Sequence, residues 1–69
     1  MFKCTNHCSN CGQHFHSVAA FDLHRFRGEC WDAATDERFI ALSRAGQCLL
    51  ARPRIRGKVT IWMRAKDAG

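Results

Sequence analysis

Four potential metal ligands stand at short intervals near the start of this sequence. Cys8 and Cys11 are separated by 2 residues, His24 follows Cys11 after 12 residues, and Cys30 follows His24 after 5. Three thiolates and one imidazole are a donor set typical of tetrahedral Zn²⁺. The spacing therefore predicts one structural zinc ion, held by Cys8, Cys11, His24 and Cys30.

The local sequence contains the elements that would bring these ligands together. Gly12 permits the tight turn that aims the first two thiolates at one point. Ser17 is a good N-cap for a helix that runs to residue 25 and carries His24, and the glycine at residue 28 lets the chain turn back toward Cys30. We expect Phe15 and Phe21 to pack beneath the metal and fix this helix.

The size of the chain makes such a cross-link necessary. With 69 residues it is predicted to be a single domain. Its hydrophobic fraction of 46% includes many alanines and five cysteines, so few side chains are large enough to build a core. Small domains of this kind need a disulfide, a metal or a partner chain.

The cysteine count favours a metal over disulfides. Five is an odd number, and no apolar run follows Met1 as in a secretory signal. We therefore expect reduced thiols and a cytoplasmic chain. No segment approaches the roughly 18 apolar residues of a membrane span, so no membrane association is expected.

The rest of the chain predicts a second helix and a hairpin. Residues 32–46 carry Asp32 or Thr35 as a cap, an apolar stripe, and Gly46 as a stop. In residues 47–66, a short apolar strand over 48–51 and a turn precede Lys58–Arg64, where alternate residues are apolar. Together with the zinc module of residues 1–31, this predicts a single zinc-stapled α+β domain.

Charge is divided between the two halves of the chain. Residues 1–37 hold three Lys or Arg against five acids, whereas residues 38–69 hold eight against one. The second half therefore suits a polyanionic partner, and we predict non-specific or weakly specific nucleic-acid binding there, DNA or RNA. The candidate residues combine guanidinium or ammonium groups with one aromatic ring: Arg52, Arg54, Arg56, Lys58, Trp62, Arg64 and Lys66.

A protein partner is the alternative. An apolar patch around Trp31, Phe39 or Trp62, or an exposed hairpin edge, would dock on an acidic host or virion protein. An enzyme is not expected, because four protein ligands leave no zinc position for water, and the chain has no recognisable catalytic motif. We therefore expect no small-molecule substrate.

The remaining cysteines and histidines are predicted to be ordinary buried or surface residues. Cys48 is predicted to be a small buried apolar residue, and Cys4 a free surface thiol. His14 and His16, on either side of Phe15, are predicted to face solvent. Cys4 and His7 also stay open as alternative zinc ligands.

The motif C-x2-C-x3-F-x5-F-x2-H-x5-C resembles a two-cysteine, two-histidine zinc finger whose last histidine is replaced by Cys30. More closely, FDLHR at residues 21–25, followed by Gly28 and Cys30, resembles the FDxHR-type zinc-binding proteins of bacteriophages. The resemblance covers residues 7–31, implies the same four zinc ligands, and would place the protein in the host cytoplasm.

The resemblance to zinc fingers also allows a prediction about sequence-specific DNA recognition. In those fingers the base contacts come from helix positions that here fall on Ser17, Ala20 and Leu23. None of these side chains suits bidentate recognition of a base, and a single finger covers only about three base pairs. The finger-like module is therefore predicted to be a structural staple.

Overall fold

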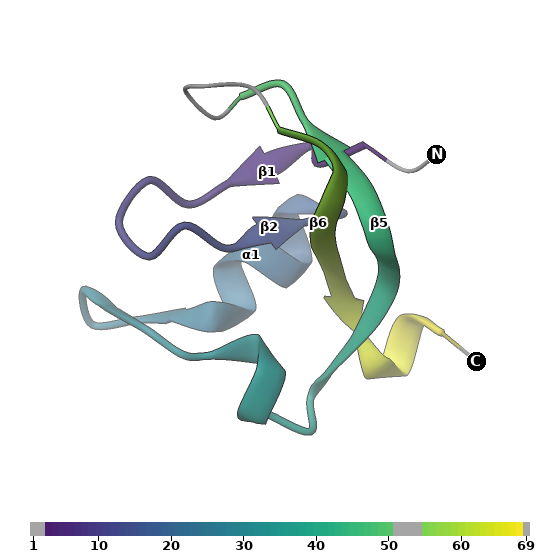
Figure 1. Cartoon of the computed structure of the whole chain (residues 1–69). Coiled ribbons are helices and arrows are strands. Elements are labelled where there is room, and N and C mark those ends of the chain that lie inside the picture. Colours follow the sequence, from purple (N-terminus) through teal and green to yellow (C-terminus); the bar gives the residue numbers. More distant parts are fainter. Residues whose placement is uncertain (1–2, 51–54, 69) are drawn as a thin grey trace.

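The computed structural model describes residues 3–50 and 55–68 (Figure 1). It is a small α+β fold, as expected from the sequence. The elements run in the order β1 (Asn6–His7), β2 (His14–Phe15), α1 (Val18–His24), β3 (Arg25–Phe26), β4 (Glu29–Cys30), η1 (Ala33–Thr35, a 3₁₀ turn), β5 (Phe39–Cys48), β6 (Ile55–Arg64) and η2 (Ala65–Asp67, a 3₁₀ turn).

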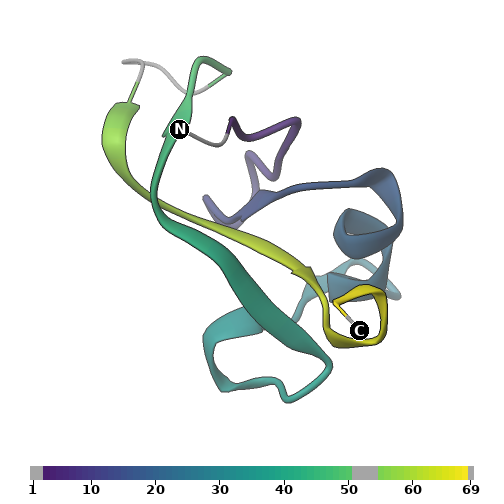
Figure 2. The same ribbon diagram turned by 90° about the vertical axis from the view of Figure 1, so that its right-hand side faces the viewer.

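The main sheet joins both halves of the chain in the order β1-β2-β6-β5. β5 and β6 form a long antiparallel ribbon, which curves across the molecule in the view of Figure 2. β2 pairs with β6 in parallel, with His14 opposite Ile61, and β1 adds antiparallel to β2. The short N-terminal strands are therefore held on the edge of the C-terminal ribbon.

The predicted first helix is present as α1, which contacts β2 and β6. The hydroxyl of Ser17 accepts a hydrogen bond from the amide of Ala20 at 3.1 Å, the N-cap arrangement expected from the sequence. α1 ends at His24, and the chain continues into the small β3–β4 hairpin. Arg27 and Gly28 form the hairpin turn with φ of 51° and 80°, the left-handed conformation that tight hairpins need. This turn returns the chain to Cys30.

The helix predicted over residues 32–46 is wrong, since α1 is the one α-helix in the part of the chain that the structure describes. Asp32 does cap a turn, accepting a hydrogen bond from the Ala34 amide at 3.0 Å, but that turn is only η1. From Phe39 the chain is the strand β5. A short apolar run of this kind fits both the 3.6-residue period of a helix and the two-residue period of a strand. A short isolated helix is only marginally stable in water, whereas β6 provides a long partner strand, so the strand forms.

The C-terminal hairpin is present, with a different first strand. Residues Lys58–Arg64 lie in β6 as predicted, but Cys48 ends the opposing strand instead of beginning it. Shifts in register along β5 show that it is bulged, a feature that bends a strand and obscures its alternation in sequence. Residues 51–54 of the predicted first strand and turn lie outside the described residues.

Two apolar clusters form the core. The first contains Cys8, Phe15, Ala20, Ala33 and Phe39, and Trp62 packs against it. Trp62, a candidate nucleic-acid contact, lies in β6, and because β6 lies between β5 and β2 and contacts α1, its side chain is partly covered. The second cluster contains Cys4, Cys48, Val59 and Ile61. Within the described residues, no helix has the length and apolar character needed to cross a membrane.

Phe15 is the centre of the first cluster, and its removal tests this core. Phe15→Ala is expected to lower the free energy of unfolding by about 3–5 kcal/mol, because it opens a cavity in a fully buried position. The matched control is Phe26→Ala, where the ring is 56% exposed and the loss should be far smaller. Urea unfolding of the metal-loaded protein measures both. Equal losses for the two variants would contradict this description of the core.

Candidate metal centre

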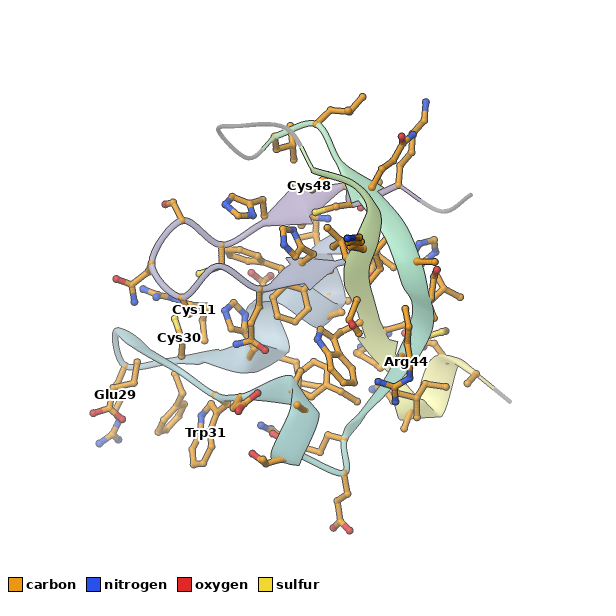
Figure 3. All side chains as sticks on the ribbon, viewed as in Figure 1. Cys11, Glu29, Cys30, Trp31, Arg44 and Cys48 are labelled. Carbon is orange, nitrogen blue, oxygen red and sulfur yellow. The ribbon has the colours of Figure 1, made fainter. Side chains whose placement is uncertain are left out.

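The structure brings together the four ligands predicted from the sequence. Cys8 and Cys11 lie in the loop between β1 and β2, His24 ends α1, and Cys30 ends β4. Their ligand atoms all lie within 4.8 Å of one another. Figure 3 shows the labelled Cys11 and Cys30 side by side at the end of the β1–β2 loop. Residues separated along the chain therefore converge on one point.

The distances match a tetrahedral zinc shell. Two sulfur ligands of such an ion stand about 3.8 Å apart, and a sulfur and an imidazole nitrogen about 3.6 Å, given Zn–S and Zn–N bonds of about 2.3 and 2.0–2.1 Å. The Sγ atoms of Cys8 and Cys30 are 3.7 Å apart. The Sγ atom of Cys11 lies 3.6 Å from Nε2 of His24. The group is thus already spaced to accept a metal of this size.

His24 is held in the orientation and tautomer that a ligand needs. Its Nδ1 lies within hydrogen-bonding distance of the Phe21 carbonyl, one turn earlier in α1. That carbonyl can only accept, so Nδ1 carries the proton and Nε2 is left with its lone pair toward Cys11. The imidazole is fully buried, which keeps its ring from turning away.

Phe15 and Phe21 hold the imidazole from below, as the sequence predicted. The Phe15 ring lies against His24 at a centroid distance of 4.3 Å, and Phe21 meets the same imidazole nearly edge-on at 5.0 Å. The two phenylalanines contact each other in a T-shaped arrangement. Because these rings are closely packed, they fix the distance between α1 and the β1–β2 loop.

Three neighbouring side chains donate hydrogen bonds to the sulfurs. Nδ2 of Asn10 lies 3.3 Å and the Arg25 guanidinium 2.9 Å from Sγ of Cys30. These two donors, together with hydrogen bonds to Cys8 and Cys11, lower the pKa of Cys30 to about 6 and favour its thiolate. Burial raises the pKa of Cys11, and the Gln13 amide, 3.2 Å from its sulfur, opposes that rise.

Gln13 also joins the metal ligands to the following loop. Its Nε2 donates to the carbonyl of Trp31 at 2.8 Å, and its Oε1 accepts from the amide of Ala33 at the same distance. Sequence reasoning missed Asn10, Gln13 and Arg25 as supporting residues. The available signal was a polar side chain within two residues of Cys11 or His24, but it becomes informative only once the fold aims those side chains at the sulfurs.

The other candidate ligands lie elsewhere. Cys4 and His7 are not members of this group of four. Cys4, expected to be a surface thiol, is buried, and His14, expected to face solvent, is largely buried as well. The exposed position predicted for His16 and the buried position predicted for Cys48 are confirmed.

The structure does not support the predicted nucleic-acid surface. Arg52, Arg54 and the side chain of Arg56 lie outside the described residues. Lys58 and Lys66 are exposed, but Arg64 forms an ion pair with Asp67 at 2.6 Å. As Trp62 packs against the first core cluster, its ring is not free to serve as a stacking platform.

In comparisons with known proteins, no family model, curated protein or solved structure matches this chain.

Arg25 is the best position at which to test the surroundings of the centre. Arg25→Met is expected to weaken zinc binding about 10- to 100-fold, because it removes a hydrogen bond and a positive charge from Cys30. Arg27→Met makes the same change in the adjacent hairpin turn and is expected to leave the affinity unchanged. Competition with a chromophoric chelator measures both. Equal affinities in the two variants would refute a supporting role for Arg25.

Proposed function

We propose that this protein binds one Zn²⁺ ion through Cys8, Cys11, His24 and Cys30, and that the ion is structural. The observation that supports this is the convergence of the four ligand atoms within 4.8 Å of one another, with the Cys8–Cys30 and Cys11–His24 pairs at tetrahedral spacing. Three thiolates and a neutral imidazole give the loaded site a net charge of −1, and Arg25 compensates it. Four protein ligands fill a tetrahedral shell, so the site suits cross-linking and not the activation of water.

Such an ion would fasten the first half of the fold. It would join the β1–β2 loop, the end of α1 and the β3–β4 hairpin, all of which are short elements with little core of their own. We further propose that residues 7–31 are related to the FDxHR-type zinc-binding proteins of bacteriophages. That relationship rests on the sequence motif.

Removal of the metal is expected to unfold this half of the protein. Stripping with a chelator should collapse the amide NMR signals of residues 8–33, and adding zinc should restore them, because binding energy here is folding energy. Cys30→Ala should prevent recovery, whereas Ser9→Ala, in the same loop but not a ligand, should recover fully. Amide shifts of residues 8–33 that stay unchanged on stripping would overturn the proposal.

A protein partner is the second proposal, and a groove beside the metal centre favours it over nucleic acid. The groove has a volume of about 850 Å³, and its walls include Phe26 and Trp31. These rings are 56% and 50% exposed, and in Figure 3 the labelled Trp31 extends away from the ribbon. The Arg38 guanidinium lies over the Trp31 ring, 5.8 Å from its centroid, a cation–π contact.

The charge of the groove indicates what it would accept. Its lining contains four carboxylates and two guanidiniums, although the chain as a whole carries a net charge of +5. Asp36 pairs with Arg38, and Arg25 faces Cys30, so Asp22, Asp32 and Glu37 remain as acidic groups. We propose that the occupant is a segment of a partner protein in which Lys or Arg lies beside an apolar side chain.

A synthetic peptide with Lys and Arg flanking Leu and Phe tests this groove. It is expected to shift the amide signals of Phe26, Trp31 and Glu37, and a version with Glu in place of Lys and Arg is not. Trp31→Ala should weaken binding by about 30-fold, the effect of losing an aromatic anchor.

Val18→Ala is the control, because its side chain is exposed outside the groove lining and its loss should leave the affinity unchanged. Random duplex DNA provides the rival outcome. Salt-sensitive DNA binding that shifts β6, with no response to the peptide, would reject the groove and favour the nucleic-acid prediction.

A further inference from the structure

A second group of metal-binding side chains lies apart from the first. Cys4, His14 and Cys48 place their ligand atoms within 4.8 Å of one another. Cys48 is fully buried, and Cys4 and His14 are 7% and 9% exposed. Figure 3 shows Cys48 where β5 meets the β1 side of the sheet, well away from Cys11 and Cys30. The two groups also belong to different core clusters.

Three separate segments build this second group. The amide of Cys4 donates to the Gln47 carbonyl at 2.8 Å, which places the N-terminal segment against the end of β5 beside Cys48. His14 is held in β2 between β1 and β6, opposite Ile61. The convergence therefore depends on the sheet topology and has no short sequence motif.

The donors match a soft or borderline cation. Two thiols and an imidazole are ligands that Zn²⁺ prefers over Mg²⁺ or Ca²⁺. The two cysteines belong to an apolar cluster with Val59, Ile61 and Leu42, so the group lies in a largely water-free environment.

His7 stands beside the group. Its ligand atoms are not among those within 4.8 Å of one another, but it contacts His14 and would complete the shell by turning toward a bound ion. Its Nδ1 lies 3.3 Å from Nδ1 of His14, with the ring centroids 4.9 Å apart. Two imidazole nitrogens bound to one tetrahedral zinc ion also stand about 3.3 Å apart, given Zn–N bonds of about 2.0–2.1 Å. The two histidines face each other across the β1–β2 pair, which keeps this spacing.

We propose that Cys4, His14 and Cys48 bind a second zinc-class ion, with His7 as its fourth ligand. The ion links the N-terminal segment and the β1–β2 pair to the end of β5. It shares no ligand with the first centre.

Cadmium-113 NMR of the cadmium-loaded chain tests the proposal without any substitution. Each bound ion gives its own resonance, whose position reports the number of sulfur ligands. We expect two resonances, one typical of three sulfurs and one of two, and native mass spectrometry should find two ions per chain. A single three-sulfur resonance would overturn the second site and leave the proposed function intact. Loss of the three-sulfur resonance alone would do the reverse.

Variants assign the second resonance to its ligands. Cys48→Ala is expected to abolish the two-sulfur resonance and to leave the three-sulfur one in place, which assigns the two signals. His7→Ala should shift the two-sulfur resonance and weaken binding at that site about 10- to 100-fold. His16→Ala removes an exposed imidazole close to His14 and should change neither signal.

Two further results would contradict the site. One is a two-sulfur resonance that survives Cys48→Ala unchanged. The other is a chain isolated with a Cys4–Cys48 disulfide, recognised by a mass lower by two hydrogens and by a cross-linked peptide after digestion. An unchanged resonance in His7→Ala would exclude His7 as the fourth ligand.

Discussion

The fold depends on keeping four donor atoms together in a chain with very little core. The buried phenylalanine at residue 15 makes this possible, because it supports His24 on one side and the apolar cluster on the other. The Phe21 carbonyl then fixes the imidazole, and the β3–β4 hairpin delivers the last thiol. Each of these parts is too short to be stable alone, so the packing of the first half and the metal ligation that we propose for it depend on each other.

The sequence was most informative where contacts are local. The four ligands of the first centre, the Ser17 cap and the role of Phe15 all lie within one short stretch, where spacing translates directly into geometry. β5 was mistaken for a helix because its apolar residues fit both periods and its bulges hide the alternation of a strand. The group of Cys4, His14 and Cys48 was unreadable in sequence, since only the pairing of β2 with β6 and of Cys4 with Gln47 assembles it.

The two tryptophans show how burial decides which surface is available for binding. Trp62 lies in the basic half of the chain, and its side chain packs against the first core cluster. Arg64, two residues later, forms an ion pair with Asp67. Trp31 follows Cys30 directly and stays half exposed, with its carbonyl hydrogen-bonded to Gln13 and its ring in contact with Arg38. An exposed aromatic side chain with few rotatable bonds loses little side-chain entropy on binding.

The parallel pairing of β2 with β6 also sets an order of assembly. His14 lies opposite Ile61, so their pairing closes a loop that spans most of the chain. The chain loses conformational entropy when this loop closes, before the paired strands can stabilise each other. The ligands from Cys8 to Cys30, by contrast, are all present before the C-terminal ribbon exists. During synthesis on a ribosome, the first half can thus become ordered early and serve as the template on which the late-emerging β6 docks.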